Sequence, residues 1–341
     1  TNKKMKAVNI STVGKIEVVN KSIPKLGRGE VLLKIKYVGF CGSDLNTFLG
    51  KNPMVKLPVI PGHEISAVIA QVGDEVPDNI KINSLCTVNP YTNCQHCSSC
   101  RNRKPNACRF NETLGVQRDG AMSEYIVAPW QKLIIDDEVT ERNLALIEPL
   151  SVGFHAVARA SVTDTDVVMV IGCGMIGMGA VIRAVQRGAS VIAVDVDDKK
   201  LQLAKSLGAL HGINSSSENL HYRLNEITNG MGPDVVIEAV GSPSTYRIAV
   251  DEVAYTGRVV YIGYAKSEVS FETKYFVSKE LDIRGSRNAL PEDFRAVIDY
   301  AKRNGIPDEF VTAIYKPEKA KEALEYWSNN SGNVFRIFIE F

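Results

Sequence analysis

Residues 167–177, V-V-M-V-I-G-C-G-M-I-G, decide the fold class of this chain. Five apolar residues, Val167–Ile171, predict a strand that is buried on both faces, and the glycines after it follow the pattern G-x-G-x-x-G. Ala180–Val185 continue a helix that ends at Gly188, and Ser190–Val194 form a second apolar strand. A strand, a glycine-rich turn, a helix and a second strand are the first unit of a parallel α/β sheet.

Each glycine of the turn meets a separate steric demand. Gly172 makes the tight turn, Gly174 lets the backbone approach a pyrophosphate, and Gly177 lets the helix lie close to the strand. The helix N-terminus adds N–H groups and a positive dipole end for the phosphates. Asp195 ends the second strand, where an acidic residue binds the ribose 2′-hydroxyl of NAD and repels the extra phosphate of NADP. The segment predicts an NAD site; the alternative is a glycine-rich turn without a ligand.

The strand and helix patterns continue after Asp195. Strands are predicted at 234–237 and 258–262, with Gly241 and Gly263 at their carboxyl ends. These ends form the edge of a doubly wound parallel sheet where the nicotinamide half of the cofactor should lie. The further residues predicted to line the cofactor site are Met175, Ile176, Val240, Ile262, Ser286 and Arg287.

Length and composition limit the class of protein. With 341 residues, 45% of them hydrophobic and 23% charged, the chain suits a globular protein of two domains. Its net charge of +1 favours neither a nucleic acid nor a membrane surface as a partner. No apolar run approaches the roughly 20 residues of a membrane span, and the N-terminal lysines precede no apolar segment. We therefore expect no secretion signal and a cytoplasmic location.

Four of the seven cysteines lie within one short segment: Cys94, Cys97, Cys100 and Cys108. Without a secretion signal, this clustering favours a metal over disulfides. Four thiolates in one loop are typical of a closed, tetrahedral structural zinc site. The nearby cations Arg101, Arg103 and Lys104 leave a phosphate-binding zinc ribbon as the alternative, whereas His96 is expected at the surface.

A second group of metal ligands is predicted around Cys41 and His63. Each lies at a strand end beside a glycine and an acidic residue. A thiolate with an imidazole is a donor pair that zinc selects, and a catalytic zinc keeps one position open. Glu148 has apolar neighbours on both sides, which argue against a surface position.

Taken together, these motifs resemble the medium-chain, zinc-dependent alcohol dehydrogenases of the sorbitol (polyol) dehydrogenase type. The matching motifs span almost the whole chain: G-F-C-G-S-D at 39–44, P-G-H-E at 61–64, the four cysteines at 94–108, E-P-L at 148–150 and the glycines at 172–177.

The resemblance implies an architecture and a set of roles. Residues 1–150 would form an irregular, chaperonin-10-like β-barrel catalytic domain, 151–285 a Rossmann NAD-binding domain, and 286–341 a segment that returns to the catalytic domain. Cys41, His63 and Glu148 would hold a catalytic zinc, with Glu64 as an alternative or exchanging ligand. Ser43 would take the substrate proton, and the four cysteines would hold a structural zinc. Such enzymes form homodimers and homotetramers.

Two segments resemble the branch that oxidises hexonates, the L-galactonate and L-gulonate 5-dehydrogenases: G-V-Q-R-D-G-A-M-S-E-Y at 115–125 and G-S-R-N-A-L-P-E-D-F at 285–294. Arg118 and Arg287 are candidates to bind a substrate carboxylate, because a guanidinium binds carboxylate through two hydrogen bonds. The alternative is that each pairs with a local acid, Asp119 or Glu292. Phe48 is a further candidate substrate contact.

Three features depart from the family pattern, one of which is Asn83-Ser84 in place of the usual Gly-Asp turn, a replacement interpreted as neutral. Asn46 stands where many alcohol dehydrogenases carry a relay histidine, which puts the proton path beyond Ser43 in doubt, and Gln117 stands where histidine is common.

The sequence thus predicts a zinc- and NAD-dependent dehydrogenase that oxidises a secondary alcohol of a polyol or hexonate to a ketone. Two alternatives stay open: a polyol dehydrogenase of the sorbitol or galactitol-phosphate type, and a non-catalytic regulatory protein that binds NAD and zinc.

Overall fold

The computed structural model describes residues 3–341 and divides into two compact units. The first comprises the chain up to Glu148 together with Leu290–Phe341, and the second comprises Pro149–Ala289. None of the described helices is long and apolar enough to span a bilayer.

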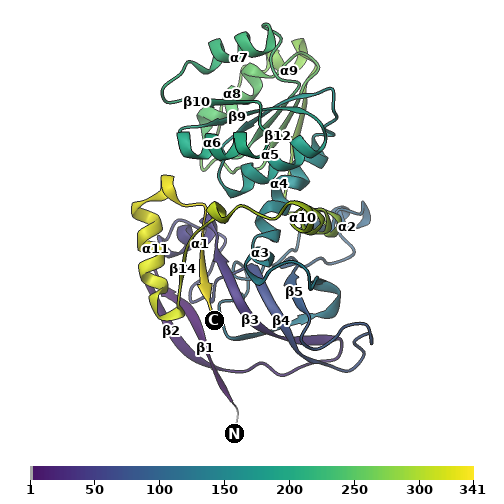
Figure 1. Ribbon diagram of the computed structural model, residues 1–341, viewed down its shortest axis with the longest axis vertical. Coiled ribbons are helices and arrows are strands. Elements are labelled where there is room, and N and C mark those ends of the chain that lie inside the picture. The colour runs from purple at the N-terminus through teal and green to yellow at the C-terminus, as the bar shows by residue number, and fades with distance from the viewer. Residues whose placement is uncertain (1–2) are drawn as a thin grey trace. The chain divides into compact units, whose positions relative to one another are not determined.

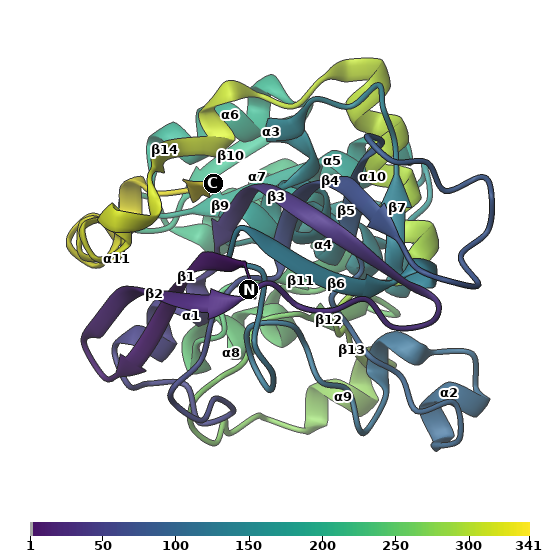
Figure 2. The ribbon, with the colours of Figure 1, turned by 90° about the horizontal axis from the view of Figure 1, so that it is seen from below.

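The first unit is built on a seven-stranded sheet. Its strands run in the order β14-β15-β3-β4-β5-β7, and β6 pairs with β3 (Figure 2). Their bounds are β3 Glu30–Phe40, β4 Glu64–Val72, β5 Leu85–Val88, β6 Tyr125–Pro129, β7 Leu133–Ile135, β14 Val311–Tyr315 and β15 Arg336–Glu340. The run V-L-L-K-I-K-Y-V at 31–38 is typical of a strand, and β3 extends beyond it because it pairs with β4, β6 and β15 along its length.

The remaining elements of the first unit lie around this sheet. A two-stranded sheet consists of β1 (Lys4–Thr12) and β2 (Lys15–Ser22), and α11 packs against β2 (Figure 1). The helices are α1 Gly42–Phe48, α2 Ser98–Arg101, α3 Glu141–Leu144, α10 Pro291–Asn304 and α11 Ala320–Asn329. Short 3-10 turns lie at Pro105–Ala107, Trp130–Lys132, Asp308–Phe310, Pro317–Lys319 and Ser331–Asn333.

The second unit is a six-stranded parallel sheet in the order β10-β9-β8-β11-β12-β13, as the doubly wound prediction requires. Its strands are β8 Val167–Ile171, β9 Ser190–Asp195, β10 His211–Asn214, β11 Val235–Glu238, β12 Arg258–Tyr261 and β13 Asp282–Gly285. The helices are α5 Met175–Gln186, α6 Asp198–Ser206, α7 Leu220–Thr228, α8 Pro243–Glu252 and α9 Lys274–Ser278, and they flank the sheet (Figure 1). Helix α4 (Ile147–Arg159) leads into this unit.

Three elements differ from what the sequence pattern predicts. The segment S-V-G-F-H-A-V-A-R-A predicts a helix at 151–160, whereas α4 begins at Ile147, so Glu148 lies in its first turn. The pattern at 317–327 predicts one helix, which the structure divides into a 3-10 turn at its proline and α11. Strand β13 was not predicted, because D-I-R-G forms a partly exposed edge strand without an apolar run.

Candidate active site and metal centres

The register of β3 and β4 brings three candidate metal ligands together. These strands are antiparallel with Gly39 opposite Glu64, so Cys41, just after β3, lies near His63, just before β4. The ligand atoms of Cys41, His63 and Glu64 all lie within 4.8 Å of one another. A Cβ at Gly39 would lie 2.4 Å from the Glu64 carboxylate, so this approach requires glycine.

Two buried polar atoms of the candidate site residues have no hydrogen-bond partner within residues 3–341: Nδ1 of His63, and Oγ of Ser43, which follows Cys41 by two residues. Buried polar atoms without a partner are costly. A thiol, an imidazole and a carboxylate around such atoms are donors that suit a zinc ion. The residues present therefore fit a catalytic zinc.

Arg336 belongs to this site and was not predicted from the sequence. It is the first residue of β15, and its Nε donates to both carboxylate oxygens of Glu64, at 3.0 and 2.9 Å. Its Nη2 lies 3.8 Å from Cys41 Sγ, and both Arg336 and Glu64 are buried. Burial opposes the charge of Arg336, but Glu64 and Cys41 outweigh it and raise the pKa of the guanidinium above its ordinary value. The sequence does carry a signal for a buried, paired Arg336, because this arginine lies within the apolar run V-F-R-I-F-I.

Glu148 is held by a second residue that the sequence did not single out, Tyr91. The Tyr91 hydroxyl donates to Glu148 Oε1 at 2.5 Å, and both side chains are buried. Burial is the main cause that raises the pKa of each group. His63 lowers the pKa of Glu148, which places the two side chains in the same electrostatic environment. The group within 4.8 Å includes Glu64 but not Glu148 among the described residues.

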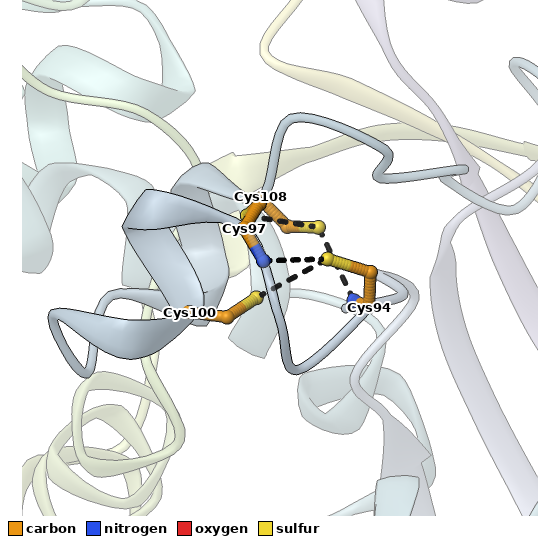
Figure 3. A group of neighbouring side chains, drawn as sticks. All are labelled: Cys94, Cys97, Cys100 and Cys108. Atoms are coloured by element: carbon orange, nitrogen blue, oxygen red, sulfur yellow. Dashed lines mark hydrogen bonds between the residues drawn. The ribbon is translucent and has the colours of Figure 1, made fainter.

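The four cysteines at 94–108 form the second candidate metal centre (Figure 3). The sulfurs of Cys94 and Cys100 lie 4.0 Å apart, and those of Cys97 and Cys108 lie 3.9 Å apart. The N–H of Cys97 donates to the sulfur of Cys94, and the N–H of Cys94 donates to that of Cys108, each at 3.3 Å. Such bonds stabilise thiolates; those from Cys100 and Arg109 lower the pKa of Cys97 to about 6. This donor set fits a structural zinc.

His96 is exposed and lies against Phe110 with the two rings tilted, outside the group of four sulfurs.

Arg118 does not pair with Asp119, so that alternative was wrong. Its Nε donates to the carbonyl of Glu112 at 3.0 Å and its Nη2 to the carbonyl of Pro90 at 3.3 Å. Asp119 instead accepts from Lys21 and from the N–H of Ile60. Arg118 therefore stabilises the backbone of the segment between β5 and β6 through these two hydrogen bonds.

Phe48, the other candidate substrate contact in this unit, is 5% exposed and belongs to its hydrophobic core cluster.

In the second unit, the turn after β8 has the conformation that its glycines allow. Gly172 has φ +92°, and a Cβ at Gly177 would lie 1.6 Å from the carbonyl oxygen of Gly172. Gly174 caps α5, and a Cβ there would meet only open space. Open space beside the backbone at a helix N-terminus fits a pyrophosphate, and Met175 and Ile176 follow in the first turn of α5.

Asp195, at the end of β9, faces this turn. Its Oδ2 accepts the N–H of Cys173 at 2.8 Å, and its Oδ1 accepts those of Val196 and Asp197. The carboxylate is thus fixed beside the glycine turn, where a ribose would lie.

The other predicted cofactor residues follow β11, β12 and β13. Val240 and Gly241 follow β11, and Ile262 and Gly263 follow β12. The N–H of Ser286 donates to the carbonyl of Tyr261 at 2.9 Å, and Arg287 is the next residue.

Comparisons with known proteins identify the family. Residues 27–136 match the model of the alcohol dehydrogenase GroES-like domain, and 176–303 match that of the zinc-binding dehydrogenases. The chain is 34% identical to L-galactonate-5-dehydrogenase of Escherichia coli K12 over 81% of each chain. It is 32% identical to sorbitol dehydrogenase of Halalkalibacterium halodurans over 96% of each chain. The structure of rspB from E. coli CFT073 with NADH, named a short chain alcohol dehydrogenase, superposes with a TM-score of 0.91, at 30% identity and 99% coverage of each chain.

These matches agree with the two metal centres and the glycine turn, and the GroES-like match agrees with the barrel expected from the sequence. Sorbitol, galactonate and idonate dehydrogenases are among the relatives, so the family is that of the zinc-type polyol and sugar-acid dehydrogenases. The chain belongs to the medium-chain, zinc-dependent alcohol dehydrogenases, and it is an oxidoreductase acting on CH–OH groups with zinc and NAD as cofactors.

Proposed function

We propose that this enzyme oxidises a secondary hydroxyl group of a hexonate, such as L-gulonate or L-galactonate, to a ketone. The observation that carries the chemistry is the group of Cys41, His63 and Glu64, together with the buried, unpartnered hydroxyl of Ser43, two residues after Cys41 in the chain. The 34% identity to an L-galactonate dehydrogenase supports the substrate class.

In this proposal Cys41, His63 and Glu148 hold the catalytic zinc, and Glu64 is an alternative ligand. A bound zinc supplies a Lewis acid that makes the substrate hydroxyl easier to deprotonate. Arg336 balances the charge of Glu64, and Tyr91 fixes the orientation of Glu148. These two partners hold the carboxylates in place before substrate binds.

Ser43 relays the proton of the substrate hydroxyl: its Oγ accepts that proton while its own O–H proton passes on to water. It lies in the first turn of α1, and its carbonyl accepts from Thr47 Oγ1 at 2.9 Å and from Asn52 Nδ2 at 3.4 Å. These bonds fix the backbone that carries the hydroxyl. A bound NAD would supply the nicotinamide ring that accepts hydride from the carbinol carbon.

The first unit would carry this chemistry and the second would bind NAD across Gly172–Gly177 and Asp195. Val240, Gly241, Ile262, Gly263, Ser286 and Arg287 would meet the nicotinamide half. Arg118 binds two carbonyls through Nε and Nη2, and Arg287 is the second candidate for a substrate carboxylate.

The test is NADH formation by zinc-loaded protein on a panel of hexonates, neutral polyols and sugar-alcohol phosphates. We expect turnover on hexonates, and Arg287→Met should raise the KM for the hexonate about tenfold or more with a smaller change for a neutral polyol. Arg303→Met, a charge removed from the exposed end of α10, is the control. Turnover confined to neutral polyols or to phosphates would contradict the hexonate proposal.

A further inference from the structure

We propose that Glu238 is a positioning residue for the nicotinamide half of NAD, because its buried carboxylate holds the loop that follows β11 and its backbone carbonyl bonds the loop that follows β12. The proposal rests on the NAD site proposed above and adds a residue outside the glycine-rich turn.

The carboxylate of Glu238 organises the first of these loops, residues 239–242. Glu238 is the last residue of β11 and is 0% exposed. Its Oε1 accepts the N–H of Val240 at 2.8 Å, that of Gly241 at 2.7 Å, and the hydroxyl of Thr245 at 2.9 Å. Because a buried carboxylate is costly unless it is hydrogen-bonded, these three bonds fix the loop and the carboxylate to one another.

The second loop, residues 262–264, lies directly against the first. The backbone carbonyl of Glu238 accepts the N–H of Ile262 at 2.9 Å. A Cβ at Gly263 would lie 2.5 Å from the nitrogen of Gly241 and 3.0 Å from Glu238 Oε2. The two loops therefore touch backbone to backbone next to the carboxylate.

Tyr246, on helix α8, adds a second set of contacts to these two loops. The hydroxyl of Tyr246 donates to the carbonyl of Gly263. The rings of Tyr246 and Tyr261 are stacked, 4.0 Å apart, and the Tyr261 hydroxyl donates to the carbonyl of Tyr246 at 2.7 Å. Glu238 and Tyr246 thus hold the same pair of loops through independent bonds.

The strand order assigns these loops to the nicotinamide half. A dinucleotide binds at the carboxyl ends of the strands, across the point where the order reverses, which is here between β8 and β11. Asp195 on β9 marks the adenosine side, so the loops after β11 and β12 serve the other half. A Cβ at Gly172 would meet Val240 Cγ2 at 2.8 Å, so the loop held by Glu238 packs directly on the glycine-rich turn. Fixing both loops beforehand lowers the cost of ordering them when the cofactor binds.

Glu238→Gln is a sensitive test of this arrangement. The other oxygen, Oε2, is buried without a hydrogen-bond partner among residues 3–341. The amide of a glutamine has two orientations here. In one, its NH₂ group replaces Oε2, where there is no acceptor. In the other, its NH₂ group replaces Oε1 and faces the three groups that now donate to that oxygen. Tyr246→Phe removes one bond from the same loops with little change in shape.

The experiment measures the Kd of NADH and of ADP by calorimetry. ADP carries only the adenosine half and the pyrophosphate, so it lacks the nicotinamide half that the two loops serve. We expect Glu238→Gln to weaken NADH binding about tenfold and Tyr246→Phe about threefold, with ADP affinity unchanged. The matched controls are Glu252→Gln, at the far end of α8, and Tyr222→Phe, which is 65% exposed; neither should change either affinity.

An equal loss of ADP and NADH affinity would overturn the positioning role, and so would unchanged NADH affinity in both variants. If Glu238→Gln does not fold, Tyr246→Phe decides by the same comparison. Failure of the unmodified protein to bind NADH would contradict the NAD site itself, which is a different result from a variant that loses no affinity.

Discussion

At the scale of single residues, the first unit contains a buried ion pair, Arg336 with Glu64. Glu64 and Arg336 are almost wholly buried, and the guanidinium bridges both carboxylate oxygens. Removing one partner of such a pair leaves the other charge buried without compensation, which costs more than the intact pair contributes.

We predict that Arg336→Met lowers the free energy of unfolding of the zinc-loaded protein by about 3–5 kcal/mol, measured by urea denaturation. Lys319→Met is the control, because Lys319 and Glu322 form an exposed pair at 3.0 Å and should contribute less than about 1 kcal/mol. Similar losses for the two variants would show that burial of the Arg336 pair is unimportant.

Asp195 is the second residue whose role, here in binding the cofactor, can be tested by a single substitution. We predict that Asp195→Asn weakens NADH binding about tenfold and narrows the preference for NADH over NADPH, because the repelling charge is lost. The amide nitrogen also cannot accept the N–H of Cys173. Titration of both cofactors gives the result, with the exposed Asp164→Asn as the control for charge. An unchanged ratio of the two affinities would remove Asp195 from cofactor selection.

At the scale of elements, the segment 94–108 has little structure that could hold it without a metal. It contains one short helix, α2, and one 3-10 turn, and among its cysteines only Cys108 is buried. Binding of one metal ion by the four sulfurs would therefore supply most of the order of this segment.

We predict that Cys97→Ser lowers the zinc content by about one ion per chain and makes this segment the first site of limited proteolysis. Ser98→Ala, at the neighbouring position, should change neither result. A Cys97→Ser protein that keeps its full zinc content would rule out four-thiolate binding.

At the scale of the whole molecule, both ends of the chain build the first unit. Strand β15 pairs with β14 and with β3, so residues 336–340 lie in the interior of a sheet whose other strands come mostly from residues 30–135. Ile337, Phe338 and Ile339 are 0% exposed.

We predict that Ile339→Ala lowers the free energy of unfolding of this unit by about 2–5 kcal/mol. Ile314→Ala, on the adjacent strand β14, is the control, because Ile314 is 46% exposed and should cost less than about 1 kcal/mol. Thermal unfolding followed by tryptophan fluorescence reports this unit, because both tryptophans, Trp130 and Trp327, belong to it. Equal effects of the two substitutions would contradict the central place of β15.

The sequence by itself determined the features that depend on local spacing. The parallel sheet follows from apolar runs alternating with helical patterns, and the glycine turn from three positions within one short segment. The four-cysteine centre is equally local, since its ligands are close together in the chain. In each case the residues that act together are neighbours in sequence, so their pattern can be read without the fold.

Only the tertiary structure decided the partners of the buried carboxylates. Arg336 reaches Glu64 because β15 pairs with β3 and β3 pairs with β4, and Tyr91 reaches Glu148 from a loop after β5. Glu238 ends an apolar strand, and its partners are identified only when the loops after β11 and β12 lie side by side. Strand register and packing set these contacts, and both depend on the whole sheet rather than on any one segment.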